Sequence, residues 1–345
     1  MLHDISVNEL FKLGKAFFID VRSENEFSGG TIPGAFNIPL FNNEERAKIG
    51  TIYTKESSKK AKEIGLQIAG SKLSCLYEQI VNLAGRNPVM LFCWRGGMRS
   101  KSLAVVLDLM GLNVFRLSGG YKAYRKSVVE FFEAEFPFHI IVLNGNTGAG
   151  KTKLLKKLKV KGYPALDLEG LANNRGSVFG GIGLGPQPTQ KQFESLLFEE
   201  ISHYQDRAYL VLECESKRIG RLTLPNSLYS AMQEGTQVLI YDTIENRANR
   251  LVREYTLVSE ALDDLRPALE KLKKRLGKSS LSQLFSLLEV KDYHGFATKL
   301  IVEYYDCLYG YPNQKREEYN LCIYNNLMEE SVKEISAFLD NNYVK

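Results

Sequence analysis

The sequence predicts an α/β protein built from two domains. Short apolar strands alternate with segments of helical pattern along most of the chain, which is typical of parallel sheets covered by helices. The length of 345 residues suits two ordinary domains better than one large core. At Phe136-Pro137 a helical segment stops, because proline disfavours a helical conformation at the preceding residue, and a new strand begins. We therefore expect one domain over residues 1–136 and a second over residues 137–345.

The elements expected in the first domain follow from apolar runs and from helical spacing. We expect strands at Phe17–Val21, Val89–Cys93 and Val114–Leu117. We expect helices at Val7–Leu13, Ser71–Leu83, Ser100–Met110 and Tyr121–Phe136.

The second domain shows the same alternation and then becomes helical. We expect strands at His139–Leu143, Tyr163–Leu166, Tyr209–Glu213, Gln237–Tyr241 and Cys322–Tyr324, with a helix at Lys151–Val160. Residues from about 245 to 311 form a mostly helical extension. Within it, leucines recur at alternating spacings of three and four and predict a packed helical stripe: Leu262, Leu265, Leu269, Leu272 and Leu276.

The composition is that of a globular protein, with 44% hydrophobic and 25% charged residues. No apolar run is long enough for a membrane span, and the N-terminal residues do not resemble a signal peptide, so we expect a cytoplasmic protein. A net charge of +5 permits a polyanionic partner without requiring one. The cysteines lack the spacing of a zinc site or a disulfide scaffold: Cys75, Cys93, Cys214, Cys307 and Cys322.

A complete phosphate-binding (P-loop) motif, GxxxxGK[ST], follows the strand at His139–Leu143. Its residues are Gly145, Asn146, Thr147, Gly148, Ala149, Gly150, Lys151 and Thr152. The glycines let backbone N–H groups turn toward one anion, and the following helix adds its positive N-terminal end. We expect Lys151 to reach a terminal phosphate and Thr152 to ligate Mg²⁺ if a metal binds. The motif accepts any di- or triphosphate. The strand ending at Glu213 is a poor match to the aspartate of a motor-like ATPase.

A second loop, from Cys93 to Ser100, joins an apolar strand to a helix. Arg95 and Arg99 lie near the thiol in sequence, and the helix N-terminus adds positive potential, so this environment favours a reactive thiolate. Such a thiolate accepts sulfur or selenium, or attacks a phosphoryl group. The other cysteines have no such surroundings and are expected to be buried side chains.

These segments resemble the rhodanese fold. Its opening signature is matched by Ile19–Arg22, Glu26-Phe27 and Gly30–Pro39, and the Cys93 loop stands where that fold keeps its persulfide cysteine. In rhodanese-like proteins a loop of seven residues, as from Cys93 to Arg99, also suits a tetrahedral anion. By the same resemblance we expect Asp20 and Arg22 to brace the loops near the cysteine.

A rhodanese-like domain followed by a P-loop NTPase-like domain with a helical extension resembles the tRNA 2-selenouridine synthase family over nearly the whole chain. Asn42–Ile52, Leu166–Gly180 and Glu213–Leu224 share in the resemblance. One departure is Asn174, where the family is expected more often to carry histidine. The resemblance implies that 2-thiouridine at the wobble position of tRNA is S-geranylated with geranyl diphosphate. Selenium from selenophosphate, supplied by its synthase, then replaces the geranylthio group. No tightly bound cofactor is implied.

Further residues are candidates for the same sites. We expect Arg175 to pair with the diphosphate and Asn174 and Ser177 to support it in a polar loop. Glu213, Glu215 and Ser216 end a strand, which is the usual position of sites in open α/β sheets, and Arg218 and Arg221 follow them.

For tRNA, we hypothesise a phosphate-backbone contact through two basic helical faces. They comprise Arg247, Arg250 and Arg253, and Lys271, Lys273, Lys274, Arg275 and Lys278. Tyr304, Tyr305, Tyr309 and Tyr311 are candidates for stacking on an anticodon base, although we expect most of them to be packing residues.

Three other functions fit parts of this pattern. An ATP-coupled rhodanese-type sulfurtransferase acting on tRNA or a thio-cofactor would load sulfur on Cys93 and turn over ATP. A Cys-x5-Arg phosphatase joined to a P-loop kinase would need a proton-donating acid that the loop does not supply. An RNA-binding regulator would bind tRNA without chemistry.

Overall fold

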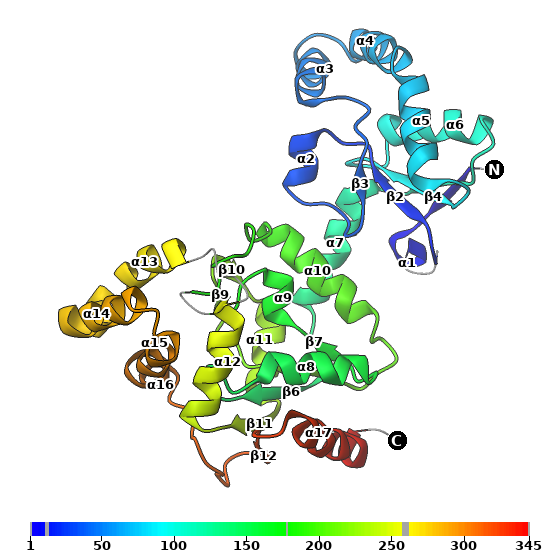
Figure 1. The fold of residues 1–345 in the computed structure, drawn as a ribbon. Helices are drawn as coiled ribbons and strands as arrows, with labels where there is room; N and C mark the ends of the chain where they lie inside the picture. Colours follow the sequence, from blue (N-terminus) through cyan, green and yellow to red (C-terminus); the bar gives the residue numbers. More distant parts are fainter. Residues whose placement is uncertain (1, 11–13, 177–178, 257–261, 344–345) are drawn as a thin grey trace. The chain divides into compact units, whose positions relative to one another are not determined.

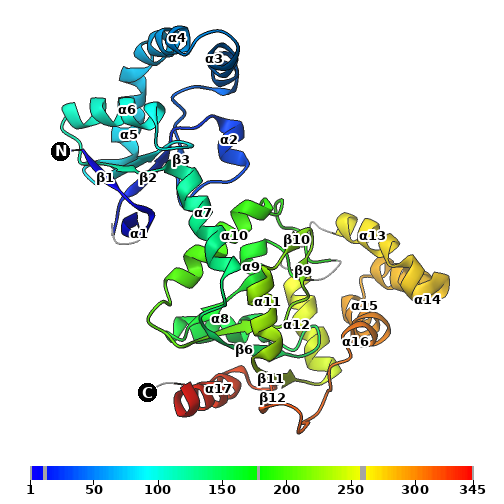
Figure 2. The ribbon, with the colours of Figure 1, turned by 180° about the vertical axis from the view of Figure 1, so that it is seen from behind.

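The computed structural model describes residues 2–10, 14–176, 179–256 and 262–343, which form two compact units (Figures 1 and 2). The first unit comprises Met1–Phe131 with Thr189–Glu199, and the second comprises Phe132–Pro188 with Glu200–Lys345. The sequence predicted one change of domain at residue 137. The structure instead divides the chain near residue 131 and adds a distant segment to the first unit.

Long-range contacts explain why the segment Thr189–Glu199 packs with the first unit. Glu194 forms an ion pair with Arg125, and the ring of Phe198 meets Phe131 edge-on at 5.3 Å. The Thr31 N–H donates to Oε1 of Gln192 at 2.8 Å. The partners lie far apart along the chain, so a local pattern of hydrophobic residues carries no sign of these contacts.

The first unit contains a five-stranded parallel sheet in the order β1-β5-β4-β2-β3. Its strands are β1 (His3–Ile5), β2 (Phe17–Asp20), β3 (Phe36–Asn37), β4 (Val89–Phe92) and β5 (Val114–Leu117). The three strands predicted from apolar runs are confirmed. The sequence analysis missed β1 and β3, because two or three residues are too few to show a periodic pattern.

Helices α3 (Asn43–Lys55), α4 (Ser58–Gly70), α5 (Leu73–Ala84) and α6 (Met98–Leu109) contribute apolar residues to the core of this sheet. The unit also contains α1 (Val7–Leu10), α2 (Glu24–Ser28), most of α7 (Gly120–Glu133) and residues 190–199 of α10 (Gln190–Ser202). Residues 11–13 of the first predicted helix lie outside the described residues. The sequence analysis missed α3, in which only Ile52 is buried, so that the helix lacks an apolar stripe.

The second unit has its own five-stranded parallel sheet, in the order β12-β11-β6-β8-β7. Its strands are β6 (His139–Asn144), β7 (Ala165–Leu166), β8 (Tyr209–Glu213), β11 (Thr236–Tyr241) and β12 (Leu321–Tyr324). The helices α8 (Lys151–Val160) and α17 (Met328–Tyr343) share one hydrophobic core with this sheet. A short antiparallel pair, β9 (Arg218–Ile219) and β10 (Leu222–Thr223), follows β8.

The remaining helices of the second unit include the predicted helical extension. They are α9 (Leu168–Ala172), α11 (Asn226–Glu234), α12 (Ile244–Thr256), α13 (Leu262–Lys271), α14 (Lys273–Glu289), α15 (Tyr293–Leu300), the π-helix η2 (Ile301–Tyr305) and α16 (Asp306–Tyr309). Leu265, Leu269 and Leu272 are buried in one cluster and Leu276 packs against it, which confirms the leucine stripe for these four. The side chain of Leu262 lies outside the described residues. Within the described residues, every helix is too short or too polar to cross a bilayer.

Candidate functional site

The cysteine loop begins where the central strand β4 ends, the usual position of a site in a parallel sheet. The Cys93 side chain is buried, with 3% of its surface exposed. Its Sγ lies 3.2 Å from Oγ of Ser100, which is buried in the first turns of α6. The sequence analysis treated Ser100 only as the start of a helix. The structure makes it the closest side-chain hydroxyl to the thiol, positioned to donate a hydrogen bond to a thiolate.

The start of α7 holds the backbone of this loop. The N–H of Tyr121 donates to the carbonyl of Cys93 at 2.9 Å, and the N–H of Lys122 donates to the carbonyl of Trp94 at 2.8 Å. A Cβ on Gly120 would lie 2.2 Å from the Cys93 carbonyl oxygen, so no side chain fits there. The sequence reasoning missed this support, although the paired glycines before a helix were a visible signal.

The two arginines of the loop have different surroundings. Arg99 donates to both carboxylate oxygens of Glu26, at 2.6 and 3.2 Å, whereas Arg95 is exposed. Burial disfavours the charged form of Arg99, but the hydrogen bond to Glu26 and the attraction of the Glu26 and Cys93 charges together outweigh it and raise the Arg99 pKa. Burial alone would raise the pKa of Glu26, but the hydrogen bond and charge of Arg99, with smaller contributions from Ser23 and Arg46, together lower it. The loop therefore has a fixed cation and a solvent-facing one.

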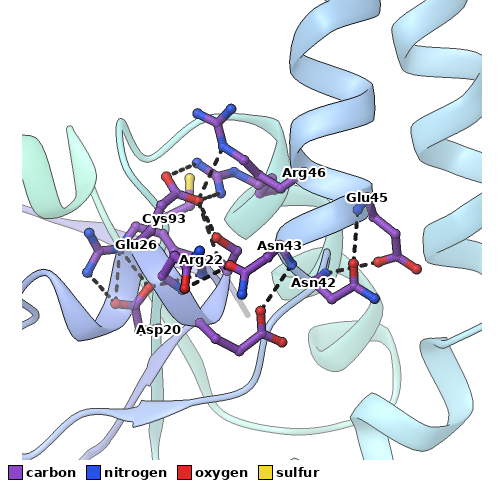
Figure 3. Close-up of polar contacts among 12 residues, drawn as sticks. Asp20, Arg22, Glu26, Asn42, Asn43, Glu45, Arg46 and Cys93 are labelled. Atoms are coloured by element: carbon purple, nitrogen blue, oxygen red, sulfur yellow. Dashed lines mark hydrogen bonds and ion pairs between the residues drawn. The ribbon is translucent and has the colours of Figure 1, made fainter.

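Asp20 and Arg22 form a buried pair beneath the loop (Figure 3). Nη2 of Arg22 lies 2.6 Å from Oδ2 of Asp20 and 2.7 Å from the Gly30 carbonyl oxygen. The hydroxyl of Thr31 donates to Asp20 at 2.8 Å, and the Arg22 guanidinium lies over the Tyr121 ring at 4.1 Å. This geometry ties β2 to the Gly30–Thr31 segment and to α7, and both charges are fully paired within the fold.

The P-loop connects β6 to α8, as its motif predicted. Gly145, Gly148 and Gly150 have φ values of 141°, 79° and 93°, a region that side chains rarely adopt. A Cβ on Gly145 would lie 2.1 Å from the carbonyl oxygen of Ile240. Nζ of Lys151 donates to the Gly145 carbonyl at 2.6 Å, so the ammonium group sits at the centre of the loop. This arrangement presents a lysine and a helix N-terminus to one anion.

Two of the eight motif residues are absent from the cavity lining. The Asn146 amide donates to the carbonyl of Tyr311 at 2.7 Å and to Oδ1 of Asn313 at 3.1 Å, and its side chain is buried. Ala149 is fully buried. The cavity is lined by the other six residues of the motif. The side chains of Asn146 and Ala149 pack into the structure behind the loop, so any contact of these two residues with phosphate would come from the backbone.

Arginines of α12 support the same loop. Arg247 is fully buried, donates through Nε to the Thr147 carbonyl at 2.9 Å, and pairs with Asp306. Arg250 donates to the Gly148 carbonyl at 3.1 Å and pairs with Asp242. The hypothesis that these two residues belong to a tRNA-binding face is wrong, since their charges are used to hold the P-loop. Arg253, in contrast, is exposed.

Three carboxylates surround Thr152. Its hydroxyl lies 2.8 Å from Oε2 of Glu213, at the end of β8, and 3.3 Å from Oε2 of Glu169. Glu215 and Glu169 both line the cavity. Burial, together with repulsion among these groups, raises the pKa of all three carboxyls. The sequence analysis expected Glu213 and Glu215 here, but it missed Glu169, which arrives from α9.

The polar loop after α9 also lies against this cavity. Asn174 and Arg175 line it. Nη1 of Arg175 donates to the Ile182 carbonyl at 3.0 Å, and Oδ1 of Asn174 accepts from the Gly176 N–H at 3.0 Å. Ser177 lies outside the described residues. Ser216 lines the cavity and donates to the Arg218 carbonyl at 2.6 Å, which fixes the turn after β8.

The cavity at the P-loop has a volume of about 670 Å³, and its lining combines two kinds of residue. The polar lining comprises the six P-loop residues, further lysines of α8 and acidic groups. The apolar and aromatic lining comprises Leu184, Tyr229, Leu251, Tyr309 and Tyr311. Burial raises the pKa of Tyr309 to about 12, and the Tyr311 hydroxyl lies 2.9 Å from Sγ of Cys214. Tyr309 and Tyr311, considered for RNA stacking, thus line this cavity.

Comparisons with known proteins match the two parts of the chain to two different domain families. Residues 6–127 match the rhodanese-like domain, and residues 138–343 match the tRNA 2-selenouridine synthase AAA domain. A tRNA 2-selenouridine synthase of Psychromonas ingrahamii is 31% identical over 91% of this chain and 93% of its own length. One of Sulfurovum sp. is 33% identical, covering 93% of each chain. Among solved structures, the N-terminal domain of a putative ATP/GTP binding protein from Clostridium difficile is 40% identical. It covers 36% of this chain and 98% of its own, with a TM-score of 0.35.

Proposed function

The chain belongs to the tRNA 2-selenouridine synthase family, and from this premise we propose that it converts wobble 2-thiouridine into 2-selenouridine through an S-geranyl intermediate. The observation that carries the proposal is the cavity of the second unit, which is lined both by a P-loop and by leucines and tyrosines. A nucleoside triphosphate needs a base and a sugar site beside its phosphates. A prenyl diphosphate needs only an apolar surface there, and this cavity provides one.

In the first step the thiocarbonyl sulfur of 2-thiouridine attacks C1 of geranyl diphosphate. A C–S bond forms, the C–O bond to the diphosphate breaks, and the N3 proton of the base is lost as the C2–N3 double bond forms. The diphosphate leaves with the electron pair, and Lys151 and the amides of the P-loop stabilise its charge. Arg175 lies in the same lining and adds a further cation for this leaving group.

A divalent cation fits this site as part of the diphosphate complex. The oxygen donors of Thr152 and Glu213 lie 2.8 Å apart, and Mg²⁺ is usually held by one or two protein groups together with substrate phosphates. The ion would neutralise charge on the leaving diphosphate. Within the described residues no cluster of three or more histidine, cysteine or acidic side chains is arranged to hold a metal by itself.

In the second step selenium replaces the geranylthio group. Alkylation turns the sulfur into a leaving group, so that a selenium nucleophile adds at C2 and the C2–S bond breaks to release geranylthiol. Selenophosphate supplies the selenium, and its P–Se bond is cleaved by water to leave phosphate. The Cys93 loop offers a thiol with the Ser100 hydroxyl at 3.2 Å and the Arg99 cation nearby, which suits selenium delivery and a tetrahedral anion.

We assign tRNA binding to the exposed cations of the helical extension. Lys271, Lys273, Lys274, Arg275 and Lys278 all have exposed side chains on α13 and α14. Phosphate contacts of this kind release counterions, so tRNA binding weakens as salt rises.

The test is mass spectrometry of nucleosides from 2-thiouridine-containing tRNA incubated with the purified protein, geranyl diphosphate and selenophosphate. We expect 2-geranylthiouridine when selenophosphate is omitted and 2-selenouridine when both reagents are present. Omission of geranyl diphosphate should leave 2-thiouridine unchanged. Unchanged nucleosides with folded protein, accompanied by ATP turnover and sulfur loading on Cys93, would overturn the proposal in favour of an ATP-coupled sulfurtransferase.

A further inference from the structure

The segment Asn42–Ile52 has no role in the chemistry above, although it belongs to the stretches that resemble the family. It forms the first turns of α3, and its polar residues attach α3 to α2 (Figure 3). Asn42 caps the helix by accepting from the Glu45 N–H at 2.9 Å, and the Glu45 carboxylate accepts from the Asn42 N–H at 2.9 Å. This capping box fixes where α3 begins.

Two reciprocal hydrogen bonds then join the starts of the two helices. The N–H of Asn25 donates to Oδ1 of Asn43 at 2.9 Å, and the N–H of Asn43 donates to Oε2 of Glu24 at 3.1 Å. Because these bonds use the first turns of α2 and α3, the next turn of α3 is held beside Glu26. The residue placed there is Arg46.

Arg46 and Arg99 share one carboxylate. Nε of Arg46 lies 3.6 Å from Oε2 of Glu26, the same oxygen that accepts from Nη1 of Arg99 at 2.6 Å. Two guanidinium groups against one carboxylate leave a net positive charge at this point. Figure 3 shows Cys93 next to Glu26 within this group, so the positive charge lies on the side of the thiol.

The Arg46 guanidinium is placed to take another anion. Its side chain is 48% exposed and approaches Glu26 through Nε, while Figure 3 shows the terminal nitrogens directed away. Gly50, one turn further along α3, leaves room for them, since a Cβ there would lie 2.8 Å from Nη1. The terminal nitrogens of an arginine form the planar fork that binds oxyanions.

We propose that Arg46 is an anion-binding residue of the cysteine site, where it acts with Arg99 to hold the tetrahedral oxyanion beside Cys93. Glu26 keeps the two arginines together when the site is empty. The inference rests on the proposed function in one respect, the assignment of a tetrahedral oxyanion to this loop. It adds Arg46, which lies outside the Cys93 loop on α3, to the residues of the site.

The experiment is calorimetric titration of the full-length protein with thiophosphate, a stable tetrahedral analogue of selenophosphate. We expect Arg46→Gln to weaken thiophosphate binding about tenfold, and Arg46→Lys to restore part of the loss, because lysine keeps the charge without the fork. Lys48→Gln removes an exposed cation from the same helix and should change binding less than about twofold. Gly50→Ala keeps every charge but crowds the guanidinium, and should weaken binding in the same direction.

Pyrophosphate, which tests the P-loop of the second unit, provides the internal control. Its affinity should be unchanged in Arg46→Gln, which separates a local effect from loss of folding. If wild type binds thiophosphate and Arg46→Gln binds it equally well, the inference fails while the proposed function stands. If wild type shows no thiophosphate binding, both the oxyanion assignment and the inference are overturned. If Arg46→Gln weakens only tRNA binding, the residue contacts the nucleic acid backbone and the inference is again wrong.

Discussion

Sγ of Cys93 and Oγ of Ser100 lie 3.2 Å apart inside the first unit, and both side chains are buried. A hydroxyl at this distance stabilises a thiolate by donating a hydrogen bond. One such bond contributes about 1 kcal/mol, which corresponds to roughly a fivefold change in rate.

Substitutions at this pair should affect the two chemical steps differently. We expect Cys93→Ala to stop selenium incorporation and to leave S-geranylation intact, because the Cys93 loop is assigned to the second step alone. Ser100→Ala should slow selenium incorporation about fivefold. Each step is measured by nucleoside mass spectrometry, and Cys75→Ala is the control. The expectation that the other cysteines are buried was wrong for Cys75 and Cys307, which are exposed. Loss of both steps in folded Cys93→Ala protein would contradict the division of labour.

Lys151→Ala should remove the diphosphate-dependent step. The ammonium group sits at the centre of the P-loop, 2.6 Å from the Gly145 carbonyl, and its loss should slow S-geranylation by about 100-fold. Binding of tRNA, measured by filter retention, should stay within about twofold because other surfaces contact the nucleic acid. Lys161→Ala changes an exposed lysine at the end of α8 and should leave both quantities unaltered. Unchanged geranylation in Lys151→Ala would exclude the P-loop as the diphosphate site.

Arg247→Met should destabilise the second unit. The substitution leaves Asp306 without its partner and the Thr147 carbonyl without its donor, and breaking a buried ion pair from one side costs about 3–5 kcal/mol. The urea-unfolding transition should therefore move to lower concentration. Lys274→Met, at an exposed position of α14, should change the free energy of unfolding by less than about 0.5 kcal/mol. Normal stability with weakened tRNA binding in Arg247→Met would restore the tRNA-facing interpretation of this arginine.

The carboxylates beside the P-loop should make stability depend on pH. Burial, followed by repulsion from Glu213, raises the pKa of Glu215 to about 7 from its ordinary value of 4.5. Between these values the folded state binds more protons than the unfolded state, so stability falls as pH rises through this window. We expect wild type to lose about 1–3 kcal/mol more than Glu215→Gln between pH 5 and pH 8.

Urea unfolding of both proteins at the two pH values measures this difference. Glu317→Gln removes an exposed carboxylate and should follow wild type. Two outcomes would contradict the presence of three crowded, buried carboxyls. One is equal stability of wild type at both pH values, and the other is a wild type that is more stable than Glu215→Gln at pH 8.

Local patterns were sufficient for much of the fold. The strands around Val89 and Tyr209 and the helix after Lys151 were predictable, because apolar runs and a glycine motif depend only on neighbouring residues. Elements without such a pattern were missed. α3 buries only Ile52, so its sequence resembles a polar segment, and its start is set by a capping box and by contacts with α2.

The same distinction between local pattern and tertiary contact applies to the two sites. By itself the sequence determined where the cysteine loop and the P-loop lie, because each is a continuous motif between a strand and a helix. Only the tertiary structure decided which side chains complete them. Arg247 binds a carbonyl 100 positions away at Thr147, Arg99 pairs with Glu26 73 positions away, and Tyr311 meets Cys214 97 positions away. The sequence does not distinguish a charged or aromatic residue that faces solvent from one that faces a partner side chain. Only folding brings the partner within hydrogen-bonding distance.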